Sequence, residues 1–220
     1  AFCRLLRRED ESDLPGVFDI ELIDQVSSEQ VYVQNTAILT TTLTDAHGGR
    51  VQITDVAPRY EHLGRIFAPV MLLRRVRAIH GSHRIRIRLR PAINYGAEQA
   101  PFTMGSNHIE YRCSDADMRL TTNVSLTHIV DENAFIVDRE FYLILGPNES
   151  VRESCGDCFY QHYRATRQYW QRYTRTLSIP FERQEAVIRA ALTLKLCTFE
   201  DTGAVVAALT TSVPEAADSG

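Results

Sequence analysis

The stretch that decides the fold runs from Glu185 to Glu215 and reads EAVIRAALTLKLCTFEDTGAVVAALTTSVPE. Its first half predicts an amphipathic helix, because apolar residues recur at helical spacing at Ile188, Ala191, Leu192 and Leu196. Gly203 follows the last predicted helical turn, where glycine makes a left-handed C-cap easy to form. The uncharged run at 205–209 is too short to span a membrane, which takes about 20 residues. We therefore expect this run to be buried in protein.

Two blocks of this stretch resemble glycoside hydrolase family 15, the bacterial glucoamylase and trehalase group. The block VIRAALTLKL at 187–196 is similar to the V-x-R-(S/A)-A-L-T-L-K-L helix that opens the catalytic α/α barrel of that family. The block TGAVVAALTTSVPE at 202–215 is similar to the T-G-A-(I/V)-V-A-A-x-T-T-S-(L/I/V)-P-E segment that follows it. Leu209 stands where many members have proline. The resemblance is looser before Thr166.

The resemblance implies an enzyme that hydrolyses α-glucosidic bonds with inversion, using two carboxyl groups on opposite sides of the anomeric carbon. In the family a sugar-binding block and the two catalytic glutamates follow later in the chain. We therefore expect the residues up to Gly220 to be the N-terminal portion of such an enzyme, inactive alone. The implied substrate is trehalose or an α-linked glucose oligosaccharide, with no cofactor and no metal.

The resemblance also places a hydroxyl-rich loop, Thr210, Thr211 and Ser212, at the rim of the substrate pocket. These hydroxyls would bond to sugar hydroxyls or cap a helix. Pro214 ends any regular element after them. No catalytic residue is predicted within the chain itself, because its acidic residues lie mostly in turns and on polar strand faces, where carboxylates are solvated or paired.

The domain organisation follows from a change in periodicity along the chain. Residues 1–150 predict an antiparallel β-sandwich, because short strands with period-two alternation are separated by polar turns. Residues 151–180 predict a helical linker, and residues 181–220 the first helix of the α/α barrel. The fold class is thus mainly β with C-terminal helices. A short helix is also predicted at Phe2–Arg8.

The predicted strands lie at 17–22, 30–34, 36–45, 50–56, 108–113, 118–122, 125–130, 135–137 and 141–145. The clearest hairpin is predicted from Val70 to Arg90, with a type II′ turn at Gly81 and Ser82. In its return strand Ile85 and Ile87 alternate with arginines. Those arginines, at 84, 86, 88 and 90 and reinforced by 74, 75 and 77, indicate either a polyanion-binding ladder or a sheet face paired with carboxylates. The second interpretation is favoured, since no aromatic residues interleave them.

A second helix is predicted from Asp157 to Thr176. Its aromatic stripe consists of Phe159, Tyr163, Trp170 and Tyr173. Such a stripe can stack on sugars, but it more often packs a helix against a sheet or barrel, which we expect here.

Composition sets limits on location and partners. The five cysteines are an odd number without dense spacing, which predicts a reducing, cytoplasmic location. Cys155 and Cys158 form a CxxC without a second ligand pair, so no zinc site is expected. The net charge of −4 argues against nucleic-acid binding, and no membrane segment or signal peptide is evident. A homo-oligomer is possible. The alternatives left open are a non-enzymatic carbohydrate-binding sandwich and an arginine-face module for polyanions.

Overall fold

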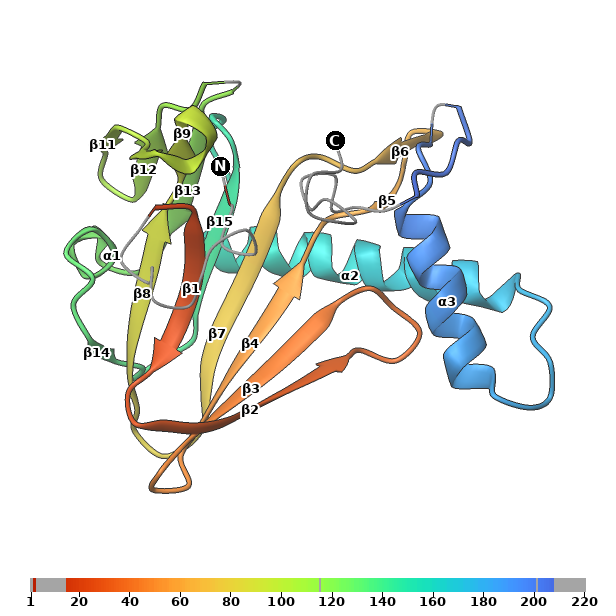
Figure 1. Cartoon of the computed structure of the whole chain (residues 1–220), viewed down its shortest axis with the longest axis horizontal. Helices are drawn as coiled ribbons and strands as arrows, with labels where there is room; N and C mark the ends of the chain where they lie inside the picture. The colour runs from red at the N-terminus through yellow and green to blue at the C-terminus, as the bar shows by residue number, and fades with distance from the viewer. Residues whose placement is uncertain (1, 3–14, 115, 201, 208–220) are drawn as a thin grey trace, which may run out of the picture.

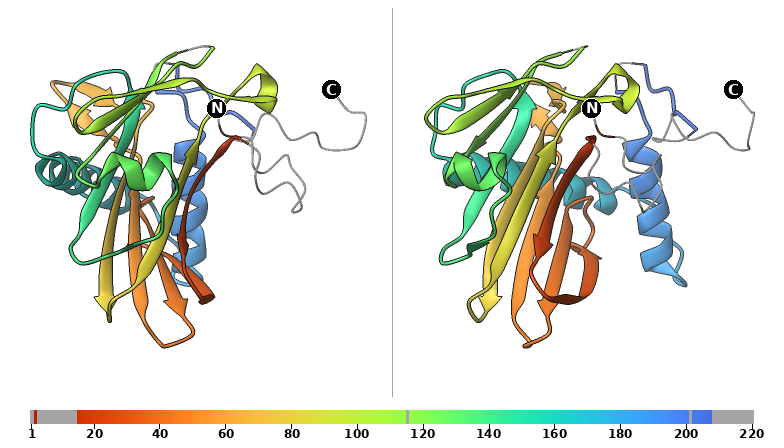
Figure 2. Two further views of the ribbon diagram at one scale, coloured as in Figure 1. Left: turned by 90° about the vertical axis from the view of Figure 1, so that its left-hand side faces the viewer. Right: turned by 60° about the vertical axis from the view of Figure 1, so that its left-hand side comes forward.

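The computed structural model describes residue 2 and residues 15–114, 116–200 and 202–207 (Figure 1). The described chain forms three layers: a small sheet, a large sheet, and a long helix on the far face of the large sheet. Figure 2 shows the long helix α2 and the strands β1 and β8 on opposite sides of the large sheet. The predicted fold class, a mainly β antiparallel sandwich followed by helices, is confirmed. No described helix is long and apolar enough to cross a membrane.

All strand pairs are antiparallel. The large sheet has the spatial order β11-β12-β13-β15-β7-β4-β3-β2, with bounds Phe102–Met104, His108–Tyr111, Met118–Thr122, Phe141–Pro147, Leu72–His80, Arg50–Val56, Leu39–Asp45 and Gln25–Tyr32. The small sheet has the order β1-β8-β14, with bounds Val17–Leu22, Arg84–Arg90 and Phe135–Ile136. Most of these strands lie where the sequence predicts them.

Shorter elements decorate the sheets. They are the hairpin β5–β6 at Tyr60–His62 and Arg65–Phe67, the pair β9–β10 at Ala92–Ile93 and Glu98–Gln99, the 3₁₀ helix η2 at Asn94–Gly96, and the helix α1 at Leu126–Val130. The long helices are α2, Cys155–Arg175, and α3, Gln184–Leu196.

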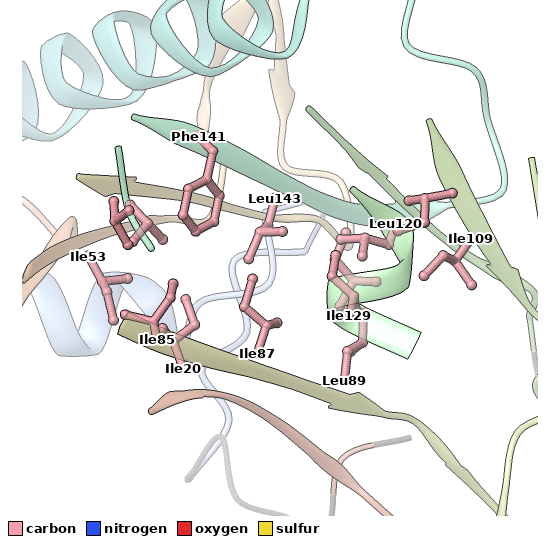
Figure 3. Packing of buried hydrophobic residues seen from close by; sticks show 14 of the residues in the cluster. Ile20, Ile53, Ile85, Ile87, Leu89, Ile109, Leu120, Ile129, Phe141 and Leu143 are labelled. Atoms are coloured by element: carbon pink, nitrogen blue, oxygen red, sulfur yellow. The ribbon is translucent and has the colours of Figure 1, made fainter. Parts of the chain in front are cut away.

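The main core lies between the two sheets (Figure 3). Because strand side chains alternate between faces, β8 directs Ile85 and Ile87 inward, where neither is accessible to solvent. They meet Ile53 of β4 and Leu143 of β15. Burying each such aliphatic side chain stabilises the fold by about 1.5–3 kcal/mol.

A second core lies between the large sheet and α2. Strand β15 is buried along nearly its whole length because both of its faces are covered: Phe141 and Leu143 face the small sheet, whereas Tyr142 and Ile144 face α2. From the helix, Cys155, Cys158 and Phe159 enter this core. The aromatic stripe therefore packs at Phe159, as predicted.

The hairpin predicted from Val70 to Arg90 is wrong. Strands β7 and β8 do not pair with each other: β7 lies between β4 and β15 in the large sheet, and β8 lies between β1 and β14 in the small sheet. Gly81 has a positive φ of 80°, as the turn prediction requires, but the chain crosses from one sheet to the other there. The local turn signal was correct and the pairing was not.

A buried histidine marks this crossing. His83 is 5% exposed, and its Nδ1 lies 2.9 Å from Oδ2 of Asp45 at the end of β3. Asp45 also accepts the backbone N–H groups of His47 and Gly49, at 2.8 Å each. A Cβ added at Gly49 would lie only 1.8 Å from Cε1 of His83, so only glycine fits against this ring. The β3–β4 turn and the β7–β8 crossing are therefore packed together.

The strand predicted at 125–130 is also wrong, since this segment forms the helix α1. Its β-branched composition favours a strand, but the helix places Leu126 and Ile129 on one buried face. Tertiary burial outweighed the local preference.

Three of the four arginines of β8, Arg86, Arg88 and Arg90, are paired with carboxylates, as the favoured interpretation predicts. Glu21 of β1 lies opposite Arg86 and accepts a hydrogen bond from it at 3.0 Å, and it also pairs with Arg88. Arg90 donates to Glu132 at 2.6 Å. Arg74 of β7 lies in the other sheet and does not extend this row. The arginines of β7 and β8 therefore do not form one continuous row.

Candidate functional site

The candidate site is the turn that follows α3, because it leads toward the predicted pocket-rim residues. The helix ends at Leu196, and an isolated bridge then pairs Thr198 with Val205. The backbone N–H of Phe199 donates to the carbonyl of Ala204 at 2.7 Å, and that of Gly203 donates to the carbonyl of Phe199 at 2.8 Å. This closed turn at 198–205 fixes the direction in which the chain leaves the helix.

Two predictions for this turn need correction. Gly203 has the predicted positive φ, 73°, but it lies in the turn and not at the helix C-cap, which is Cys197. The uncharged run was expected to be buried, yet Val205 is 58% exposed and Val206 is 46% exposed. The pocket-rim residues Thr210, Thr211 and Ser212, and the predicted helix at Phe2–Arg8 apart from Phe2, lie outside the described residues.

A charged cluster holds the turn against the sandwich. Arg59, in the connection between β4 and β5, pairs with Glu200, and its Nη2 also lies 3.4 Å from the carbonyl of Thr198. Lys195 of α3 approaches Glu200 to 3.1 Å, and the hydroxyl of Tyr169 on α2 donates to it at 3.4 Å. Three separate parts of the chain therefore converge on one carboxylate.

The electrostatics of this carboxylate favour its ionised form. Burial alone would raise the pKa of Glu200, but the hydrogen bonds and charges of Arg59 and Lys195 outweigh it and lower the pKa below its ordinary value. A general acid needs a raised pKa. Glu200 is therefore a structural anion, in agreement with the predicted paired state of the chain's carboxylates.

Arg59 also contacts an aromatic ring and a hydroxyl group that belong to α2. Its guanidinium lies 5.7 Å from the ring centroid of Trp170, and its backbone N–H donates to the hydroxyl of Thr166 at 3.1 Å. Trp170 is 1% exposed. Sequence reasoning missed Arg59, because it lies 141 residues from Glu200 and nothing local indicates the pairing.

A second arginine holds the middle of α3. The guanidinium of Arg189 lies 3.7 Å from the ring centroid of Tyr32 at the end of β2, and its Nη2 donates to the carbonyl of Thr36 at 3.0 Å. The hydroxyl of Tyr173 on α2 donates to the carbonyl of Ala191 at 3.3 Å. Helix α3 is thus tied by polar contacts both to the sandwich and to α2.

One carboxyl group does have a raised pKa. Burial raises the pKa of Asp55 on β4, although the neighbouring Arg74 opposes this effect. Arg74 donates to Asp55 at 2.9 Å and to the carbonyl of Phe18 at 2.9 Å, and so connects the two sheets. This pair lies inside the sandwich, where it connects the layers.

A cavity of about 720 Å³ lies between β15 and the start of α2. His162 lines it, and its Nδ1 lies 3.1 Å from the hydroxyl of Tyr60. Cys158 also lines it, and burial raises the pKa of its thiol to about 11, so the thiol stays protonated and unreactive. Burial raises the pKa of Cys155 as well. The described residues contain no group of three or more metal ligands.

Comparison with known proteins adds one similarity. The chain is 27% identical over 193 residues to a trehalase of Thermoplasma acidophilum, a match that covers 86% of this chain and 33% of that protein. The chain therefore spans about a third of the length of the curated relative it matches. No protein-family model matches the chain. No solved structure matches it either.

Proposed function

We propose that the chain is the N-terminal part of an inverting α-glucosidase of glycoside hydrolase family 15, and that the complete enzyme releases glucose from trehalose or a related α-glucoside. The observation that supports this most is the pair of blocks at 187–196 and 202–215, which lie on α3 and on the segment after it. The distant similarity to a trehalase is consistent with the proposal. Residues 1–150, 151–180 and 181–220 would then be the sandwich, the linker and the start of the barrel of a cytoplasmic enzyme.

In this proposal the catalytic acid and base are supplied by the remainder of the protein. Such an acid protonates the leaving oxygen while the base activates a water on the opposite face of the sugar. The described residues contribute positioning: Arg59 and Arg189 fix α3 and its turn, and the turn directs the chain toward Thr210, Thr211 and Ser212. Those hydroxyls would contact the sugar at the rim.

The test is hydrolysis by the full-length protein. It is incubated with trehalose, maltose and a longer α-glucan, glucose release is measured, and proton NMR identifies the first anomer formed. Release of β-glucose supports the proposal, because inversion converts an α-linkage into the β-anomer. With trehalose, inversion yields one β-glucose from the attacked ring and one α-glucose as the leaving group, whereas retention yields α-glucose alone. No glucose from any α-glucoside, or glucose formed without initial β-anomer, contradicts the proposal. Sugar binding without hydrolysis would instead favour the carbohydrate-binding sandwich.

A further inference from the structure

The last strand of the large sheet has an open edge. All eight residues of β2 are exposed, and among the described strands it pairs with β3 alone (Figure 1). Natural proteins protect such edges with lysine, proline or covering elements, because unpaired main-chain groups bind other strands. The sequence of β2, QVSSEQVY, contains no lysine, arginine or proline and has Glu29 as its only charge. The edge is therefore suited to receive another strand.

The outward-facing groups of β2 can be assigned from its pairing with β3. The backbone N–H of Val33 donates to the carbonyl of Ile38 at 2.9 Å, which makes these two a hydrogen-bonded pair. Since hydrogen-bonded and non-bonded pairs alternate along an antiparallel ladder, the next residue, Tyr32, points its main-chain groups away from β3. The same holds for Gln30 and Ser28, which continue the same register.

We propose that β2 pairs antiparallel with β2 of a second copy of this chain, centred on Gln30. In this register the two Gln30 residues face each other across the two-fold axis, and each Ser28 faces the partner's Tyr32. Every outward-facing residue from 28 to 32 then exchanges hydrogen bonds with an outward-facing residue of the other copy. The register also avoids the irregularity between Gln25 and Ser27.

Charge favours this register over its nearest competitor. A register centred on Glu29 would also align outward-facing residues, but it would place the two Glu29 carboxylates directly opposite each other, which is destabilising. In the register centred on Gln30, Glu29 instead faces Val31 of the partner, which is 54% exposed in the single chain. The pairing is self-complementary in its main-chain hydrogen bonds and avoids a contact between like charges.

The test measures the oligomeric state of the full-length protein by sedimentation at several concentrations. Gln30→Pro removes an outward backbone N–H without removing a backbone bond to β3, so it abolishes the dimer. It also removes the side-chain bond from Nε2 of Gln30 to Oγ1 of Thr41 on β3. Val31→Lys places a cation opposite Glu29 of the partner and tightens the dimer, whereas Val31→Glu weakens it. Each of the two Val31 variants changes the dissociation constant of the dimer about fivefold. The two Val31 variants are matched in position and exposure, so their opposite signs identify the register.

A protein that is monomeric at all concentrations overturns the proposal. A dimer whose dissociation constant is unchanged by Gln30→Pro, in a variant with an unchanged melting temperature, also overturns it. So does a dimer whose dissociation constant changes equally in both Val31 variants. The measurement is repeated with a double variant, Leu194→Ser with Phe199→Ser, to distinguish association through the exposed end of α3 from pairing of β2. This double variant leaves a β2 dimer intact. The result does not depend on whether the protein hydrolyses α-glucosides.

Discussion

Helices α2 and α3 are both amphipathic in sequence, but they are held in different ways. α2 places Phe159 inside the core that it shares with the large sheet, where the side chain has no solvent exposure. On α3 only Leu192 is fully buried, and Leu194 remains 61% exposed. α3 is attached mainly through arginine, tyrosine and glutamate contacts. α2 thus completes the sandwich, whereas α3 is anchored to it and leaves part of its apolar surface exposed.

The largest expected effect tests the α2 side of this comparison. Phe159→Ala should lower the free energy of unfolding by about 3–5 kcal/mol, because it removes a buried aromatic ring and leaves a cavity. Leu194→Ala, at an exposed position of α3, should change it by less than about 0.5 kcal/mol. Urea unfolding monitored by circular dichroism measures both. Similar losses in the two variants would contradict the comparison.

The second prediction tests the anchoring of α3. Arg59→Met should lower the free energy of unfolding by about 1–3 kcal/mol, because it removes charge-assisted hydrogen bonds to Glu200 and the carbonyl of Thr198. Amide hydrogen exchange of Phe199 and Gly203 should accelerate in this variant, since their bonds close the turn. Arg59→Lys is the matched control, and it should keep part of the effect because the charge remains. Unchanged exchange in Arg59→Met would show that the pair does not hold the turn.

The fold was predictable wherever local pattern and tertiary packing agree. The alternation in β8 correctly predicted buried Ile85 and Ile87 and a paired arginine face. The pattern failed where the partner strand is distant: the turn at Gly81 looks the same whether the chain returns in one sheet or crosses to another. The helix α1 was missed because burial of Leu126 and Ile129 outweighed composition.

The candidate site was less predictable than the fold. The sequence located α3 and the positive φ of Gly203, but not the ion pair of Arg59 with Glu200, because these two residues meet only through the folded sandwich. The exposure of Val205 and Val206 was also missed. An apolar run predicts burial, but a local pattern does not say whether the covering surface belongs to the same part of the chain.

A smaller expected effect is the pH dependence of the ion pair between Arg59 and Glu200. The pKa of Glu200 is lowered from its ordinary value of 4.5, so its ionised form stabilises the fold above that pH, and this contribution is lost as the pH falls through the lowered pKa. Glu200→Gln should therefore cost about 0.5–1 kcal/mol at pH 7, since the group is partly exposed. The difference between the two proteins should shrink toward zero below the lowered pKa. A difference that is constant with pH would contradict the role of the charge.

The smallest effect on stability, and the most direct test of the free surface of α3, comes from its exposed apolar residues. Leu194→Ser with Phe199→Ser should change the free energy of unfolding by less than about 1 kcal/mol, because both side chains are largely exposed. The same double variant should reduce self-association of the chain expressed alone, since exposed apolar patches drive association. Light scattering with and without the substitutions measures this, and Phe181→Ser, at a 95% exposed position before α3, is the control.

If the double variant associates as strongly as the unmodified chain, the free surface of α3 is not the cause. If the unmodified chain is a clean monomer, α3 needs no partner, and the contrast with α2 reduces to a difference in burial alone.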